Sequence, residues 1–301
     1  MRDLIRRTFR RFFLILAWPF RMIVKPFTAI RTFINNEPDD TPLVDVFTAT
    51  VEQPSLLIDH LEALRRHILR ALVVLTLAVL VSMAFTRYIL EWLSIPIGGL
   101  ESLQAIEVTE SVGAYMRVAF LSGFTIALPY IALEIFAFLN PGLRRRERVT
   151  LLMIIPIATG LFITGAAFTY YIMLDPALDF LLHFLGIETA IRPSNYIRFV
   201  TGLMFWIGIA FQFPLIIYAL AALGIVNARS LIQGWRFAIL GIAFAAAAVT
   251  PTIDPVNMGL VMLPMIVLYF LSIGMAGLAT RGRSRRQAQV QHEAGTSDLK
   301  D

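Results

Sequence analysis

Residues 149–174 read VTLLMIIPIATGLFITGAAFTYYIML, 26 consecutive residues without one charged side chain. A hydrocarbon slab of roughly 30 Å takes about 20 apolar residues to cross as a helix. Inside that slab every backbone N–H and C=O group must be bonded within the protein, and a helix does this within its own segment. We therefore predict that this stretch is a transmembrane helix.

The same pattern occurs five more times after residue 66, and Glu134 is the only charged residue in the six stretches. The other five cover residues 71–86, 118–143, 199–228, 237–253 and 255–280. Pro251 shortens the fifth in chain order to a usable helix of about 15 residues, or about 22 Å. We predict an all-α polytopic membrane protein with six transmembrane helices, of which the fifth and sixth are short.

Composition supports a membrane domain and argues against a soluble enzyme. Mean hydropathy is +0.72 and only 16% of residues are charged, far below the quarter that soluble domains carry. The net charge of +5 resides at the ends of apolar runs and near the N-terminus. This placement fits lipid headgroups, and no nucleic-acid partner is expected. With no cysteine, disulfides and thiolate metal sites are excluded.

The polar connectors predict the orientation. Residues 144–148, 229–236 and 281–286 carry four, two and four arginines and one acid, Glu147, whereas acidic residues follow the first and third stretches. Because basic connectors stay in the cytoplasm, both termini are predicted to be cytoplasmic.

Four regions are expected along the chain. Residues 1–34 mix arginines with aromatic and aliphatic residues, so we expect a basic amphipathic segment on the membrane surface. Residues 35–54 are predicted to be a polar linker and residues 55–280 the membrane domain. Residues 281–301 are predicted to be a disordered cytoplasmic tail.

Enzyme signatures are absent from the sequence. It contains no His-Glu-x-x-His, no Gly-x-Gly-Asp, no Gly-x-Ser-x-Gly and no P-loop. We therefore expect no enzymatic activity, no cofactor and no metal.

Polar motifs at the edges of the spans carry the functional signal. They are HLEALRR at 60–66, LNPGLRRRE at 139–147, FQFP at 211–214, TPTIDP at 250–255, and Pro264, Leu268 and Tyr269. In this order on a six-span chain they resemble the TatC family, the receptor subunit of the twin-arginine protein translocase, over about residues 55–280. Further like residues are Pro96, Phe138 with Pro141 and Leu143, FTYY at 168–171, Pro176, Phe180 and Pro214.

The resemblance implies a function and its partners. The family binds folded precursor proteins through signal peptides that carry two adjacent arginines. It assembles with the single-span proteins TatA and TatB, associates with itself in the receptor complex, and exports cargo with the proton-motive force. It therefore implies the cytoplasmic (inner) membrane of a bacterium or archaeon, and structural roles for Pro96, Pro141 and Pro264.

Two acids on the predicted cytoplasmic face could receive the arginine pair. Glu62 and Glu147 both lie among arginines, and bidentate pairing with a carboxylate gives a guanidinium both geometry and energy. The resemblance adds Arg65 and Phe138 to this site. Alternatively, Glu62 caps a helix together with Asp59 or pairs with an arginine one turn later. Glu147 could only lower the charge of its loop, and Phe138 could be core.

A second set of polar residues is expected within or beside the membrane, where a partner could make contact: Gln212, Pro214, Thr250 and Asp254. FQFP is expected to break the fourth stretch, and the Gln212 amide either bonds a neighbouring backbone carbonyl that Pro214 frees or faces a cavity in which a partner helix docks. Asp254 is expected to cap the sixth helix, with Pro255 in its first turn. Glu134 is expected to reach the interface or pair with an arginine.

Three departures from the family pattern keep other functions open. Ala63 stands where the family usually has an acid, His67 replaces a common arginine, and Phe270 stands where glutamate is frequent. One alternative is a secondary transporter of a small solute, although such proteins need ionisable groups near the membrane midplane. The other is a membrane scaffold of the same fold that has lost export activity.

Overall fold

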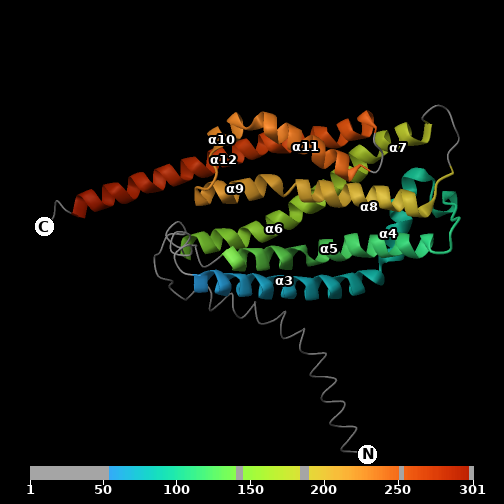
Figure 1. Cartoon of the computed structure of the whole chain (residues 1–301), viewed down its shortest axis with the longest axis horizontal. Helices are drawn as coiled ribbons and strands as arrows, with labels where there is room; N and C mark the ends of the chain where they lie inside the picture. The colour runs from blue at the N-terminus through green and yellow to red at the C-terminus, as the bar shows by residue number, and fades with distance from the viewer. Residues whose placement is uncertain (1–53, 140–144, 184–189, 251–253, 298–301) are drawn as a thin grey trace, which may run out of the picture. The chain divides into compact units, whose positions relative to one another are not determined.

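The computed structural model describes residues 54–139, 145–183, 190–250 and 254–297, and these are helical with no strand among them (Figure 1). Five helical stretches are long and apolar enough to cross a membrane, and the shorter apolar helix Trp235–Val249 supplies the fifth span in chain order. The predicted all-α, six-span membrane fold is confirmed, and the fifth span is short as predicted. The sixth span was also predicted to be short, but this is wrong, because its apolar part covers the 26 residues Pro255–Thr280.

α-Helices make up most of the described residues. Their bounds are α3 Pro54–Met83, α4 Thr86–Leu93, α5 Glu110–Leu139, α6 Arg145–Phe168, α7 Leu174–His183, α8 Pro193–Ala210, α9 Phe213–Leu223, α10 Ala228–Gln233, α11 Trp235–Val249 and α12 Pro255–Ser297. Two 3₁₀ turns, η1 Ile95–Ile97 and η2 Leu100–Ser102, follow α4, and a π-helical turn, η4 Thr169–Met173, joins α6 to α7.

The chain divides into two compact units. Unit 1 comprises Met1–Ala84 and Ser122–Thr159, and unit 2 comprises Phe85–Leu121 and Gly160–Asp301. Unit 1 thus holds α3, the second part of α5 and the first part of α6.

Unit 1 depends on a close approach of α3 and α5. Gly123 of α5 is buried, and a Cβ atom built there would lie 2.6 Å from the Cα atom of Val79 in α3. Small side chains continue this contact surface on α3, where Ala78 and Ser82 are buried. Without a hydrophobic force between helices in lipid, such close packing is what holds them together.

Unit 2 contains a break in the fourth span. Helix α8 ends at Ala210 and α9 begins at Phe213, and the two follow each other along nearly one line (Figure 1). Pro214, which is buried, has no N–H to continue the helical ladder, so the chain turns at Phe211 and Gln212. The break was predicted from FQFP, and it is confirmed.

The last three spans of unit 2 pack together. Helix α12 packs along α9 and α11, as Figure 1 shows. Asp254 caps α12: its Oδ1 atom accepts a hydrogen bond from the backbone N–H of Asn257 at 2.7 Å. The predicted cap is confirmed.

Two helices extend beyond the predicted stretches. Helix α5 begins at Glu110 and not near residue 118. Helix α12 runs on to Ser297, so most of the segment expected to be a disordered tail is helical. The regions predicted for residues 1–34 and, apart from Pro54, for residues 35–54 lie outside the described residues.

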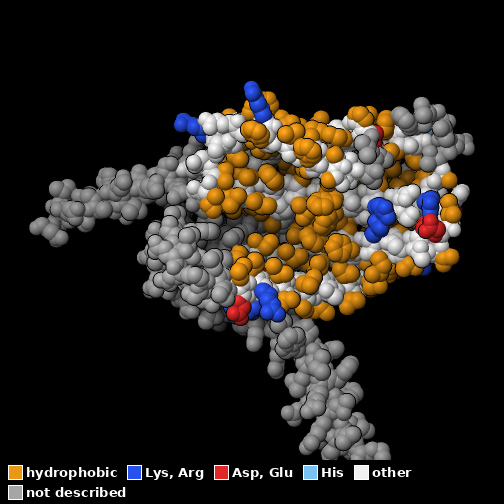
Figure 2. Space-filling model, viewed as in Figure 1, with side chains coloured by type: hydrophobic (Ala, Val, Ile, Leu, Met, Phe, Trp, Pro, Cys, Tyr) orange, Lys and Arg blue, Asp and Glu red, His pale blue; other side chains and the backbone are white. Residues whose placement is uncertain are grey.

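The outward surfaces are apolar. Hydrophobic side chains dominate the face in Figure 2 and few charged groups appear on it. Exposed examples are Leu80, Phe237, Phe244 and Leu263. A soluble protein would not leave such a surface in water, whereas a bilayer covers it.

Candidate functional site

The first half of the candidate site lies on the N-terminal part of α3. Glu62 and Arg65 are both exposed there, so their charged groups are available to a ligand. Because α3 begins at Pro54, Glu62 follows the first turns of the helix and cannot be the return half of a cap with Asp59. The capping alternative is therefore wrong.

One face of α3 turns toward α5. Residues four apart share a helix face, and Ala63 and His67 are both partly buried whereas Glu62, Arg65 and Arg66 are exposed. The departure at residue 63 thus has a structural consequence. We call Ala63 and His67 the α5-facing stripe of α3. Glu62, the acid of this part of α3, lies beside the stripe and not in it.

Glu134 of α5 meets that stripe. Its side chain is 4% exposed, and its Oε2 atom lies 2.5 Å from Nδ1 of His67, whose side chain is 20% exposed. The hydroxyl group of Tyr130, one turn earlier on α5, is a second hydrogen-bond partner of Glu134. We expected the membrane interface or an arginine as the partner of Glu134, but the partner is His67. The pair could not be read from the sequence because its members are 67 residues apart.

Phe138 completes this corner of unit 1. It is partly buried, and its ring lies edge-on to the imidazole of His67 with centroids 6.1 Å apart. It follows Glu134 by four residues on α5, so both side chains project from one face. The structure therefore brings His67, Glu134 and Phe138 together, with Glu62 and Arg65 on the neighbouring face of α3.

The other predicted site residues of this region are at the start of α6. Glu147 is the third residue of α6, but its side chain lies outside what the structure describes. Pro141 lies outside the described residues altogether. An acid in the first helical turn also interacts favourably with the helix dipole, so Glu147 has a structural role available to it as well.

The predicted intramembrane residues belong to unit 2 and are spread over three places. Gln212 is partly buried at the break between α8 and α9, beside Pro214. Thr250 is the buried residue that follows the last residue of α11. Its hydroxyl group donates a hydrogen bond to the carbonyl of Ala246 at 2.9 Å. Asp254 starts α12, and its second oxygen accepts a bond from the Asn257 amide at 3.0 Å.

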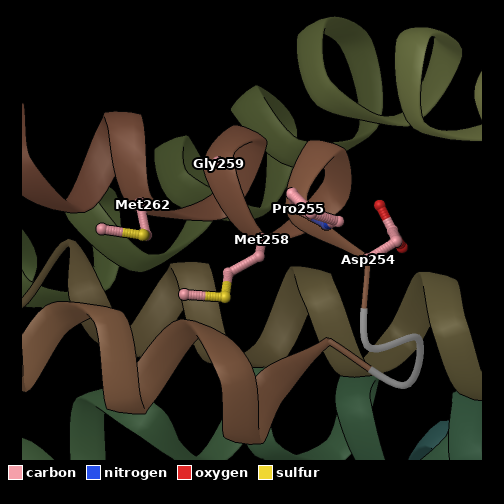
Figure 3. Close-up of a pocket in the computed structure, with 5 residues that line it drawn as sticks. All are labelled: Asp254, Pro255, Met258, Gly259 and Met262. Atoms are coloured by element: carbon pink, nitrogen blue, oxygen red, sulfur yellow. The ribbon is translucent and has the colours of Figure 1, made fainter.

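A pocket lies at the start of α12. It has a volume of about 360 Å³ and is lined by Asp254, Pro255, Met258, Gly259 and Met262. Figure 3 shows Met258 and Met262 one turn apart along α12, with the Asp254 carboxylate at the other end of the group. This pocket is apolar apart from its one acidic end, and methionine side chains adapt readily to the shape of what they contact.

The predicted structural prolines occupy different settings. Pro96 is exposed in the turn η1, and Pro264 is buried within α12. Pro264 removes one backbone donor from α12 without ending the helix.

A charged clamp not anticipated from the sequence lies in unit 2. Arg192, just before α8, bonds Glu110 at the start of α5 and also Glu107, whose Oε1 atom lies 2.9 Å from its Nη2 atom. These bonds hold the pKa of Arg192 above its ordinary value. No group of three or more potential metal ligands occurs among the residues that the structure describes.

Comparison with known proteins gives a consistent result. Residues 59–264 match the family model for the Sec-independent protein translocase protein TatC. The chain is 36% identical over 226 residues to the protein of that name from Deinococcus radiodurans, covering 72% of this chain and 84% of the relative. It is 35% identical over 224 residues to the one from Synechocystis, covering 74% and 88%.

The fold agrees as well. A crystal structure of the "Twin Arginine Translocase Receptor- TatC" superimposes with a TM-score of 0.66 at 29% sequence identity, over 73% of this chain and 99% of that one.

Proposed function

Because the chain belongs to the TatC family, we propose that it is the receptor subunit of a twin-arginine protein translocase. In this role it binds the twin-arginine signal peptides of folded precursor proteins and takes part in their export. The observation that carries the proposal is the match to the solved receptor over nearly the whole of that chain. We propose no catalytic activity.

The arginine pair would bind at the N-terminal part of α3 and the start of α6. Glu62 and Glu147 are the proposed acids, because a guanidinium pairs in a bidentate way with a carboxylate. Glu62 and Arg65 are exposed on one side of α3, which supports their availability. Phe138 would contact the apolar part of the peptide, beside the site of its charges.

TatA-like and TatB-like single-span proteins are the proposed partners within the membrane. Gln212 and Pro214 at the break of the fourth span, and Thr250 and Asp254 at the ends of α11 and α12, are the proposed contacts. An amide that faces another helix in lipid gains about 0.6–2 kcal/mol from a hydrogen bond. The pocket beside Asp254, with its two methionines, suits an apolar helix that presents one polar group.

The proposed location is the cytoplasmic (inner) membrane of a bacterium or archaeon, with both termini in the cytoplasm. The basic connectors support this orientation. Only then do Glu62 and Glu147 face the compartment in which precursors are made. Self-association in the receptor complex is a further part of the proposal.

Export of a folded reporter tests the function. A strain without its own TatC would receive this chain together with the TatA-like and TatB-like proteins of its own source. We expect export of a reporter with an Arg-Arg signal and none with a Lys-Lys signal. If neither reporter is exported although the chain inserts normally, the scaffold alternative is supported. Proton flux that depends on a small solute, in vesicles without the TatA-like and TatB-like proteins, would support the transporter.

A further inference from the structure

The structure describes the side chains of two acids in unit 1, Glu62 and Glu134. Glu62 belongs to the proposed peptide site, whereas Glu134 has no role in that site. Glu62 is exposed on α3, whereas Glu134 is buried on α5 under His67. A buried carboxylate in a membrane helix is costly, so such residues are kept where they have a partner or a function. The question is what this acid binds besides an imidazole.

The partners of Glu134 leave capacity for a stronger donor. A carboxylate has about four acceptor positions on its two oxygens. The described partners are Nδ1 of His67 and the hydroxyl group of Tyr130, each of which supplies one hydrogen at most. A guanidinium supplies five N–H donors in a planar fork that matches both carboxylate oxygens.

The position of Glu134 also favours a cation. It lies just before the last turn of α5, which ends at Leu139. The C-terminal end of a helix carries partial negative charge from its free carbonyl groups, and this charge adds to that of the carboxylate.

His67 occupies one oxygen of the acid. Its imidazole contacts Oε2 of Glu134 and is partly exposed, whereas Glu134 is buried, and the Phe138 ring lies edge-on beside the imidazole. A change of the His67 rotamer would uncover Oε2 of Glu134 next to an aromatic wall. An aromatic ring beside a carboxylate suits an arginine, whose guanidinium plane stacks on aromatic faces.

We propose that Glu134 is an additional guanidinium-binding carboxylate of the signal-peptide site, and that His67 occupies it until one arginine of the pair displaces the imidazole. The inference rests on the proposed function and adds a recognition residue to it. In this account Glu134 supplies, from α5, the acid that the α5-facing stripe of α3 lacks at Ala63. The competing account is that the His67–Glu134 bond only fastens α3 to α5.

Binding of four peptides distinguishes these accounts. The full-length chain in lipid nanodiscs would be titrated with synthetic signal peptides that carry Arg-Arg, Lys-Arg, Arg-Lys or Lys-Lys and are otherwise identical. In Glu134→Gln we expect the Arg-Arg peptide to bind about 10- to 100-fold more weakly, which is the effect of losing a charge-assisted hydrogen bond. One of the two single-lysine peptides should then bind as well as the Arg-Arg peptide, because the arginine that its lysine replaces no longer has a partner in this variant.

Two further variants serve as controls. His67→Leu removes the helix–helix bond but keeps the acid, so arginine should bind at least as tightly as in the original protein. Glu91→Gln breaks an exposed pair with Arg87 elsewhere and should change nothing. Thermal unfolding of each variant would show whether it is folded.

The possible results separate the two proposals. If Glu134→Gln still discriminates at both arginine positions, the inference is wrong and the function stands. If Glu134→Gln and His67→Leu weaken all four peptides equally, the pair only joins the two helices, and the inference is wrong. If the unaltered protein binds all four peptides equally, the proposed function itself fails, and this inference with it.

Discussion

At the scale of single residues, two tyrosine hydroxyl groups fasten the end of α4. The last carbonyl groups of a helix have no partner within it. Tyr196 of α8 donates to the carbonyl of Leu93 at 2.6 Å, and Tyr170 of η4 donates to the carbonyl of Trp92 at 2.8 Å while stacking on its ring. Both tyrosines are buried. Neither bond could be predicted, because each joins residues far apart in the chain.

We expect Tyr196→Phe to lower the free energy of unfolding by about 1–3 kcal/mol, the cost of leaving a buried acceptor without a donor. Tyr171→Phe is the matched control, since Tyr171 is 66% exposed, and it should have no effect. Unfolding of the purified protein in detergent measures both. Equal stability of the two variants would contradict this role for Tyr196.

A second single-residue prediction concerns the clamp around Arg192. Arg192→Gln leaves Glu110, which is buried, without its cationic partner, so the variant should unfold at a lower temperature. Arg87→Gln breaks a pair between two exposed side chains and should have little effect. Thermal unfolding of both variants, side by side, tests the difference. A clamp that contributes nothing would give two identical curves.

At the scale of helices, the contact of α3 with α5 depends on the absence of a side chain at Gly123. In Gly123→Ala the new Cβ atom meets the backbone of Val79, which cannot move aside as a flexible side chain could. We expect a loss of about 1–3 kcal/mol, typical of overpacking. Gly160→Ala is the control, because nothing lies within 4 Å of a Cβ atom there. Stability of Gly123→Ala equal to that of the control would show that the helices are not in close contact.

The helices also show what sequence could and could not predict. Runs of apolar residues identified six spans, Pro214 identified the break in the fourth, and Asp254 with Pro255 identified the start of α12. The true start of α5 was missed because its polar first turn is held by Arg192, which is 82 residues away from Glu110. Local patterns predict where a helix can form, whereas its ends depend on distant partners.

At the scale of the whole molecule, the same limit applies to the candidate site. Motif order led to the family and to Glu62, Arg65, Phe138 and Glu147 as candidates. It did not lead to the pairing of His67 with Glu134, since a histidine and an acid on separate helices form no motif. Side-chain positions in the helices were needed to see that Glu62 is turned away from the stripe that holds His67.

A prediction at this scale concerns Glu147, the second proposed acid of the signal-peptide site. We expect Glu147→Gln to reduce export of an Arg-Arg reporter at least about tenfold, the effect of losing a charge-assisted hydrogen bond to a guanidinium. Insertion of the protein should be normal, because the change keeps the shape of the side chain. Reporter activity outside the cytoplasm and the amount of protein in the membrane are the two measurements. Full export would remove Glu147 from the site.

The most direct test of the central claim is site-specific photocrosslinking from Phe138. A photoreactive phenylalanine analogue at residue 138 would report whether a precursor docks beside the ends of α3 and α5. The same analogue at Leu80, which is 59% exposed and far along α3, is the control. We predict a crosslink from residue 138 to an Arg-Arg precursor, a loss of that crosslink with a Lys-Lys precursor, and none from residue 80. Crosslinking from residue 138 that does not depend on the arginines would contradict the account.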